Sequence, residues 1–294
     1  MLITTCGNSE MLAKKLAKQL RARYLPLTIA AFPDGDLYLR YPVASLKSQT
    51  VVLVESFQPH PNQTFLHVLF AAETAKDLGA KKVILVAPYL AFLRQDARFK
   101  PGEAISSQIM AKLLSKAVDK IITIDPHLHR YASLNELFTI PGKRLTADPL
   151  LAEYIQRHYP DAVLVGPDWE SSQWAAAIAK SLGMASTTLK KKRLSPTNVQ
   201  VRFVDHLAVK GKTVVLVDDI LSTGKTIAAA SREARKRGAR QVVAIAVHGV
   251  FVPGAQETVK RAGVSPVITT NTITHPTNKI DVTPLLAAAL REGT

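Results

Sequence analysis

The sequence predicts an α/β protein with two similar domains, each a mostly parallel sheet flanked by helices. Two observations predict this class. Short continuous apolar runs alternate with stretches of helical periodicity, which is typical of parallel strands covered on both faces. The same plan occurs twice along 294 residues, a length that suits two ordinary domains. We place the boundary in the stretch between Pro141 and Pro149, which gives domains over residues 1–144 and 145–294.

In the first domain, apolar runs predict three buried strands, over Thr50–Val54, Val83–Val86 and Ile121–Ile124. Between the first two strands, Thr64–Leu78 has helical character and is followed by Gly79, a common residue just after a helix. Between the last two, Ile105, Ile109 and Leu113 recur every four residues and predict a further helix.

The second domain follows the same order. Its apolar runs predict three strands, over Ala162–Val165, Val214–Val217 and Val242–Val247. Helices are predicted between them, over Ser171–Leu182 and Thr226–Arg237, and each is followed by a glycine. In open parallel sheets, ligands bind beyond the carboxyl ends of the strands, so the loops after these apolar runs are the candidate sites.

Composition narrows the function classes. No run approaches the roughly 18 apolar residues of a membrane span, and the N-terminus lacks the charged start and cleavage site of a signal peptide. We therefore expect a cytoplasmic protein without a membrane partner. The single cysteine, Cys6, can form neither an internal disulfide nor a zinc cluster. We expect it to be a small buried residue on the first strand.

The formal net charge of +15 predicts attraction to polyanions, which include nucleic acid, membrane surfaces and phosphorylated small molecules. Only 6% of the residues are aromatic, and no nucleic-acid-binding module is recognisable. The basic residues between Arg232 and Arg240 lie near the end of a predicted helix, where the helix dipole favours cations. We therefore expect no nucleic-acid partner.

The most informative stretch is Val214–Thr226, which runs from a buried strand into a hydroxyl-rich loop that opens a helix. Backbone N–H groups at a helix start can hold a phosphate, helped here by the hydroxyls of Ser222, Thr223 and Thr226. Gly224 would allow the main chain to approach that phosphate closely.

Two carboxylates, Asp218 and Asp219, stand between the strand and this loop, where they would face hydroxyls of a sugar attached to the phosphate. The run Gly224–Thr226 is not part of a Walker A loop. That motif requires a glycine five positions before Gly224, and position 219 is aspartate.

This stretch resembles the phosphoribosyl-binding loop of type I phosphoribosyltransferases and ribose-phosphate pyrophosphokinases. The resemblance implies that both domains have the type I phosphoribosyltransferase architecture and that this loop binds ribose 5-phosphate. The loop residues so implied are Asp218, Asp219, Ser222, Thr223, Gly224, Lys225 and Thr226.

Two segments of the first domain resemble the pyrophosphokinases in particular. Phe32–Asp36 is similar to the segment with which that family holds the adenine of ATP across a subunit interface, and Pro88–Asp96 is similar to its aromatic-rich loop ending in Arg-Gln-Asp. The implied ATP-binding residues are Phe32, Asp34, Gly35, Asp36, Arg94 and Gln95. The resemblance also implies a homo-oligomer built from dimers, with the ATP site near a subunit interface.

Metal ligands are implied by two further elements. Asp125-Pro126-His127 resembles the family's Asp-Leu-His element, whose histidine binds magnesium, although imidazole is a less usual magnesium ligand than oxygen. Gly166-Pro167-Asp168 resembles its Pro-Asp element, whose aspartate supports the same metal. The implied ligands are His127 and Asp168, and the implied cofactor is Mg²⁺ as two ions, one of them carried by ATP.

The basic run Lys190–Arg193 resembles the family's flexible catalytic loop with its Lys-x-Arg pair, although three adjacent lysines leave a one-residue register open. In the natural register, the resemblance implies that Lys191 and Arg193 are catalytic and that Arg193 also contacts ribose 5-phosphate. The segments His248–Phe251 and Thr270–Ile273 and a final helix over Asp281–Leu290 also look like family segments. We expect this last helix to pack back on the first domain.

The implied substrates are ATP and ribose 5-phosphate. The C1 hydroxyl of the sugar would attack the β-phosphorus of Mg-ATP, which gives AMP and phosphoribosyl diphosphate. Two other readings remain open. A phosphoribosyltransferase would lack the Phe32 and Arg94 segments, and a catalytically silent regulatory homologue would not need the catalytic and metal-binding residues.

Overall fold

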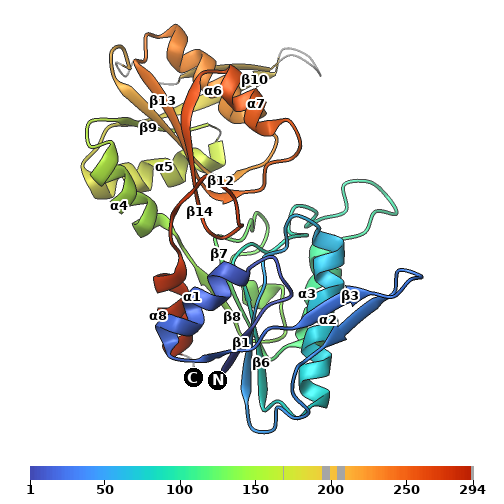
Figure 1. The fold of residues 1–294 in the computed structure, drawn as a ribbon. Helices are drawn as coiled ribbons and strands as arrows, with labels where there is room; N and C mark the ends of the chain where they lie inside the picture. Colours follow the sequence, from blue (N-terminus) through green and yellow to red (C-terminus); the bar gives the residue numbers. More distant parts are fainter. Residues whose placement is uncertain (168, 194–198, 204–208, 293–294) are drawn as a thin grey trace. The chain divides into compact units, whose positions relative to one another are not determined.

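The computed structural model describes residues 1–167, 169–193, 199–203 and 209–292, which form two compact units (Figure 1). The first unit contains Met1–Thr146, Thr272–Thr274 and the C-terminal segment from Val282. The second contains Ala147–Asn271 and His275–Asp281. The chain therefore passes from the second unit back to the first near its end.

The first unit has a six-stranded parallel sheet in the order β2-β1-β5-β6-β7-β8. Its strands are β1 (Leu2–Thr4), β2 (Arg23–Tyr24), β5 (Thr50–Val54), β6 (Lys82–Ala87), β7 (Lys120–Ile124) and β8 (Gly142–Leu145). Its helices are α1 (Glu10–Leu20), α2 (Pro61–Asp77), α3 (Ser106–Ala117), α8 (Thr283–Arg291) and the short 3₁₀ helix η1 (Leu134–Glu136). A separate hairpin consists of β3 (Thr28–Ala31) and β4 (Leu37–Arg40).

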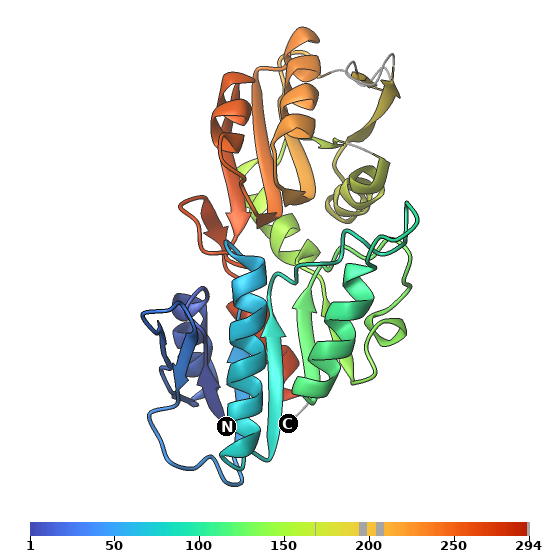
Figure 2. The same cartoon turned by 90° about the vertical axis from the view of Figure 1, so that its right-hand side faces the viewer.

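Helices cover both faces of this sheet, as Figures 1 and 2 show. Helices α1 and α8 lie side by side on one face, and α2 and α3 lie on the other. The guanidinium of Arg291 on α8 donates to the carbonyl oxygen of Gln19 on α1 at 3.0 Å. The central strands bury nearly all their side chains, because both faces are covered.

The second unit has a seven-stranded sheet in the order β11-β10-β9-β12-β13-β14-β15. Its strands are β9 (Val163–Gly166), β10 (Ser186–Arg193), β11 (Val199–Phe203), β12 (Thr213–Leu221), β13 (Gln241–Gly249), β14 (Val264–Thr270) and β15 (Asn278–Ile280). Its helices are α4 (Asp148–His158), α5 (Trp169–Leu182), α6 (Lys225–Lys236) and α7 (Ala255–Arg261). Strands β10 and β11 pair antiparallel, and the other described neighbours pair parallel.

The predicted α/β class with two mostly parallel, helix-flanked sheets is confirmed. Three local expectations differ from the structure. Cys6 lies beyond the end of β1 and is only partly buried. Strand β12 continues to Leu221, past the predicted end at Val217, because β13 pairs with it along this extension.

The third difference concerns α3. Ile109 and Leu113 are 52% and 39% exposed, so the apolar repeat seen in the sequence does not face the sheet. The buried face of α3 instead contains Ser107, Met110, Ala111 and Leu114. Within the described part of the chain, no helix combines the length and the apolar character that spanning a bilayer requires.

Candidate active site

The two carboxylates predicted to contact a sugar lie in the C-terminal half of β12. Asp218 is 8% exposed and Asp219 is partly buried. Asp218 Oδ1 accepts a hydrogen bond from the N–H of Asp219 at 3.1 Å, and Asp219 Oδ1 accepts one from the N–H of Ile220 at 2.7 Å. Main-chain donors therefore orient both carboxylates at the carboxyl end of a central parallel strand, where ligands bind in such sheets.

The predicted phosphate loop follows directly. Ser222 is partly buried and Thr223 is exposed, and α6 begins at Lys225 with Gly224 as its N-cap residue. The N–H of Lys225 lies 3.4 Å from Thr223 Oγ1. The first N–H groups of a 12-residue helix thus lie directly after two hydroxyl-bearing residues, an arrangement that favours an anion.

Gly224 is required here for a reason that the sequence does not reveal. Its φ of +71° is a left-handed conformation. A Cβ at this position would also lie 2.5 Å from Val259 Cγ2 and 3.0 Å from the carbonyl oxygen of Ala255. The close approach made by this glycine is therefore to α7, which supports the loop from behind.

A second support for the loop comes from the segment after β13, which sequence reasoning did not assign to the site. The N–H groups of Phe251 and Val252 donate to the carbonyl oxygens of Leu221 and Ser222 at 3.0 and 3.2 Å. The Phe251 ring stacks on His275 with centroids 4.3 Å apart. The sequence showed little sign of this role, because the segment supports the loop through main-chain N–H groups, which any residue other than proline provides.

The predicted adenine-binding segment forms the tip of the β3–β4 hairpin. The N–H of Phe32 donates to the carbonyl oxygen of Asp36, and the N–H of Gly35 donates to that of Phe32, both at 2.8 Å. Gly35 has a φ of +95°, and Asp34 Oδ1 accepts from the N–H of Asp36 at 3.2 Å. Phe32 is 51% exposed. An exposed aromatic ring on a closed turn can stack on a nucleotide base.

The Arg-Gln-Asp segment follows β6. Arg94 is exposed, and the carbonyl oxygen of Gln95 accepts from the N–H of Ser107 at 3.2 Å. Asp96 is buried and pairs with Arg130, whose Nε lies 3.2 Å from Asp96 Oδ1. Asp96 therefore anchors this loop to the segment after β7, which leaves Arg94 accessible to a ligand.

His127 lies just beyond β7, partly buried, at the carboxyl end of the first unit's sheet. Its ring lies edge-on to that of His129, with centroids 3.8 Å apart and the two Nε2 atoms in contact. The other predicted ligand, Asp168, lies outside the described residues. Within the described ranges, no group of three or more His, Cys, Asp or Glu residues converges as a metal site. The predicted donors, an imidazole and a carboxylate, can serve as ligands of Mg²⁺, which usually takes its remaining ligands from phosphates and water.

The predicted catalytic pair lies on a strand rather than in a loop. The main chains of Lys191 and Arg193 belong to β10 and pair with Val201 and Val199 of β11. The side chains of both residues are outside the described part of the structure. Their catalytic roles therefore stay predictions.

A buried carboxyl group supports the loop after β1. Glu55 is fully buried and accepts hydrogen bonds from Thr5 Oγ1 at 2.6 Å and from the N–H groups of Cys6 and Asn8 at 2.6 and 3.0 Å. Burial raises its pKa from the ordinary 4.5 to about 7, although these donors favour the ionised form. The same loop binds the returning chain, since Thr274 Oγ1 donates to the carbonyl oxygen of Asn8 at 3.1 Å.

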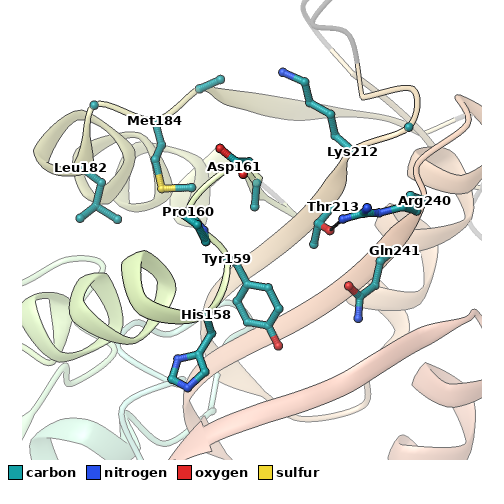
Figure 3. Close-up of a pocket in the computed structure, with 14 residues that line it drawn as sticks. His158, Tyr159, Pro160, Asp161, Leu182, Met184, Lys212, Thr213, Arg240 and Gln241 are labelled. Carbon is teal, nitrogen blue, oxygen red and sulfur yellow. Dashed lines mark hydrogen bonds between the residues drawn. The ribbon is translucent and has the colours of Figure 1, made fainter.

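A cavity of about 730 Å³ opens elsewhere on the second unit (Figure 3). Among its lining residues, Thr213 and Gln241 begin β12 and β13, so it lies at the amino ends of the strands. Arg240 in its wall donates to Thr213 Oγ1 at 3.3 Å. His158 and Leu182, which end α4 and α5, line this cavity, and the negative dipole ends of these helices favour the cations Lys212 and Arg240 there. The cavity is at the opposite end of the sheet from Asp218.

Comparisons with known proteins agree with this arrangement. Residues 1–117 match the family model described as the N-terminal domain of ribose phosphate pyrophosphokinase, and residues 133–284 match the phosphoribosyl transferase domain model. The chain is 37% identical to the ribose-phosphate pyrophosphokinase of Methanothermobacter thermautotrophicus, over 99% of this chain and 100% of that protein. It is 33% identical to that of Methanopyrus kandleri, over 99% of this chain and 98% of the relative.

A solved structure shares the whole architecture. The crystal structure of phosphoribosylpyrophosphate synthetase from Mycobacterium smegmatis superposes with a TM-score of 0.87 at 30% sequence identity, covering 100% of this chain and 98% of that one. The first family model, both relatives and this structure carry the same assignment, and the two relatives and the structure do so along nearly the full length. The chain belongs to the ribose-phosphate pyrophosphokinase family.

Proposed function

We propose that the chain transfers the β,γ-diphosphate of Mg-ATP to the C1 hydroxyl of ribose 5-phosphate, which yields 5-phospho-ribose 1-diphosphate and AMP. The C1 oxygen forms a bond to the β-phosphorus while the bond from that phosphorus to the bridging oxygen of AMP breaks, and the hydroxyl proton passes to water. The observation that carries the proposal is the pair of oriented carboxylates followed by a phosphate loop on one strand–helix turn of the second unit.

Ribose 5-phosphate is held by this turn. Its phosphate accepts hydrogen bonds from the first N–H groups of α6 and from the hydroxyls of Ser222, Thr223 and Thr226. Asp218 and Asp219 accept hydrogen bonds from the ribose hydroxyls, because ionised carboxylates act only as acceptors. Since their own main-chain bonds already orient them, little ordering is needed when the sugar binds.

ATP is held by the first unit. Phe32 stacks on the adenine at the hairpin tip, with Asp34 to Asp36 closing the turn beneath it. Arg94 and Gln95 contact the nucleotide. His127 and Asp168 would hold one of two magnesium ions, and the other would arrive with ATP. When bound, the ions would supply neutralisation of charge on the phosphate oxygens.

Lys191 and Arg193 stabilise the negative charge that develops on the oxygen of the departing AMP. Arginine can do so with a two-pronged contact and lysine as a point charge. Removing one contact of this kind costs about 10²–10³-fold in rate. Lys191→Ala should therefore lower kcat by about that factor and leave ribose 5-phosphate binding nearly unchanged.

The test is to incubate the purified chain with ATP, magnesium and ribose 5-phosphate and to follow AMP, ADP and the sugar diphosphate. Formation of AMP and the sugar diphosphate in equal amounts, dependent on the sugar, supports the proposal. ADP formed instead would mean attack at the γ-phosphorus and would overturn it. Binding of both substrates without turnover would favour a silent regulatory homologue. Consumption of 5-phospho-ribose 1-diphosphate with a nucleobase, without ATP, would favour a phosphoribosyltransferase.

We also propose that the chain acts in the cytoplasm as a homo-oligomer built from dimers, with the ATP site near a subunit interface. Its support is an exposed apolar surface on the first unit, formed by Leu66 and Phe70 on α2 and by Ile109 and Leu113 on α3. Helix α2 contacts both α3 and β4, so this surface adjoins the hairpin that carries Phe32. Large exposed apolar surfaces of this kind mark interaction sites.

A further inference from the structure

Two segments with proposed roles in ATP binding leave the same edge of the first unit's sheet. Strands β6 and β7 pair parallel, so the segment Pro88–Asp96 and the turn that carries His127 both begin at carboxyl ends of neighbouring strands. Arg130 follows His127 by three residues and is exposed. An exposed cation therefore lies close to both segments.

A buried carboxylate fixes the guanidinium of Arg130. Only 6% of the Asp96 side chain is exposed, and its Oδ1 lies 3.2 Å from Arg130 Nε. The other oxygen, Oδ2, is buried and has no hydrogen-bond partner within the described part of the chain. Asp96 is therefore bonded to Nε alone, and neither terminal nitrogen of Arg130 donates to it.

An aromatic ring restrains the same guanidinium from a second direction. Its central carbon lies 5.8 Å from the centroid of the Phe99 ring, which is within the range of a cation–π contact. The main chain at Phe99 is itself held, because the Glu103 carboxylate accepts hydrogen bonds from the N–H groups of Phe99 and Lys100, both at 3.0 Å. Two contacts therefore define the position of the guanidinium before a ligand binds.

The terminal nitrogens of Arg130 are available to a ligand. A guanidinium has five N–H donors, and among the residues that the structure describes only the donor on Nε has a partner. The side chain is 58% exposed, so a ligand in solution can reach the other four. Arginine presents these donors as a planar fork that matches two oxygens of one phosphate group. Since the guanidinium is already in place, little side-chain entropy is lost when it binds.

The charge of the surrounding segment favours an anionic ligand. Arg94, Arg98 and Lys100 are exposed on the segment that Asp96 anchors. The two acids of this segment, Asp96 and Glu103, already accept hydrogen bonds from the protein. This edge of the first unit therefore attracts polyanions, and the phosphate chain of a nucleotide is one of them.

We propose that Arg130 is a phosphate-contacting residue of the ATP site. Its two terminal nitrogens bind oxygens of the phosphate chain, while Asp96 and Phe99 hold the guanidinium in place. This inference rests on the proposed function, which assigns ATP to the neighbouring residues Arg94 and His127. The opposing view is that Arg130 only fixes the loop through Asp96 and does not touch the ligand.

Nucleotide affinity tests this contact without turnover. Calorimetry compares the binding of Mg-ATP and of adenosine to the full chain, and circular dichroism checks that each variant is folded. Arg130→Gln should weaken Mg-ATP binding by about tenfold or more, because hydrogen bonds to a charged group are lost, and should leave adenosine binding nearly unchanged. Arg130→Lys should recover only part of the loss, since an ammonium keeps the charge without the fork.

Asp96→Asn separates a phosphate contact from a role in holding the loop. Asparagine retains an oxygen acceptor and the size of the side chain, so Arg130 keeps its donors, and Mg-ATP binding should weaken much less than in Arg130→Gln. Equal losses in these two variants would mean that the pair only holds the loop, and would overturn the proposal. So would an Arg130→Gln loss that is the same for Mg-ATP and adenosine.

A control variant tests for an effect of overall charge. Arg157→Gln removes a similarly exposed arginine of α4 that pairs with Glu153, and it should leave both affinities unchanged. A loss of Mg-ATP binding equal to that of Arg130→Gln would assign the effect to net charge and overturn the contact.

The product assay distinguishes failure of this inference from failure of the proposed function. Normal Mg-ATP affinity in Arg130→Gln, while the unaltered chain forms AMP, would overturn the role of Arg130 alone. Mg-ATP affinity that depends on Arg130, in a chain that forms no AMP, would support the contact and overturn the transfer reaction.

Discussion

Replacing Glu55 with glutamine should remove a pH dependence from the stability of the first unit. Glu55 is fully buried, and burial raises the pKa of its carboxyl group to about 7 from the ordinary 4.5. The folded state therefore binds this proton more tightly than the unfolded state does. The resulting stabilisation is complete below pH 4.5 and is lost as the pH rises through about 7.

The magnitude follows from that difference in pKa. Each pKa unit corresponds to about 1.4 kcal/mol, so the Glu55 carboxyl should make the first unit about 3 kcal/mol less stable at pH 8 than at pH 4. Glutamine cannot ionise and has nearly the same shape. The difference in unfolding free energy between the unaltered chain and Glu55→Gln should therefore change by about 3 kcal/mol from pH 4 to pH 8. The contributions of all other titrating groups are the same in both proteins and cancel in this difference.

Urea denaturation at several pH values measures this difference, with the single cysteine as the probe. Both tryptophans, Trp169 and Trp174, belong to the second unit, so their fluorescence does not report on the first. Accessibility of the Cys6 thiol does report on it, because Cys6 donates its N–H to Glu55. A pH-independent difference, or stability that rises with pH, would refute the reasoning. It would mean that the donors from Thr5, Cys6 and Asn8 outweigh burial and keep the carboxyl ionised.

Three further outcomes are expected. Gly224→Ala should destabilise the second unit by about 2 kcal/mol or more, because it adds both left-handed strain and a clash with Val259. The midpoint of urea unfolding, followed by tryptophan fluorescence, measures this loss. Phe32→Ala should raise the KM for ATP by roughly 2- to 10-fold with little change in kcat, because a stacked ring contributes about 0.5–1.5 kcal/mol to binding; steady-state kinetics measure it. A double variant, Ile109→Glu with Leu113→Glu, should convert the proposed homo-oligomer to a smaller species in light scattering, since a charge buried unpaired in an interface costs about 3–5 kcal/mol.

Each outcome has a matched control. Gly183→Ala adds a Cβ at a φ of +64° with no heavy atom within 4 Å, so it should cost only the strain of about 1 kcal/mol. Phe32→Tyr retains the aromatic face and should retain the KM for ATP. Met11→Glu places one such charge on α1, where Met11 is 64% exposed, and should leave the mass unchanged. An equal loss of stability in both glycine variants, or an unchanged mass in the double variant, would contradict the respective reasoning.

Local patterns in the sequence were sufficient for the fold class and for the position of the predicted phosphate loop at the end of a central strand. A strand buried on both faces must be continuously apolar, so runs such as Val214–Val217 identify central parallel strands. The loop from Asp218 to Thr226 is continuous in sequence, and the structure places it at a single strand–helix turn. The hairpin tip at Phe32 is likewise local, because a glycine and turn-forming aspartates specify it.

Features that depend on distant segments could not be read in this way. The apolar repeat of α3 did not reveal its buried face, because Ile109 and Leu113 are exposed and the smaller residues beside them pack on the sheet. Strand β12 extends beyond its apolar run because β13 pairs with it. The role of Glu55 is hidden in the sequence because its hydrogen-bond donors lie 47 to 50 residues away.

The sequence by itself therefore determined the two-sheet α/β class and the composition of the phosphate loop, because hydrophobic periodicity and helix-start chemistry act over a few neighbouring residues. Tertiary structure alone decided why Gly224 must be glycine, which side of α3 is buried, and that His129 lies against His127. These properties depend on contacts with atoms of other helices and strands, or on the path of the backbone in space. Neither can be read from the order of residues in a single sequence.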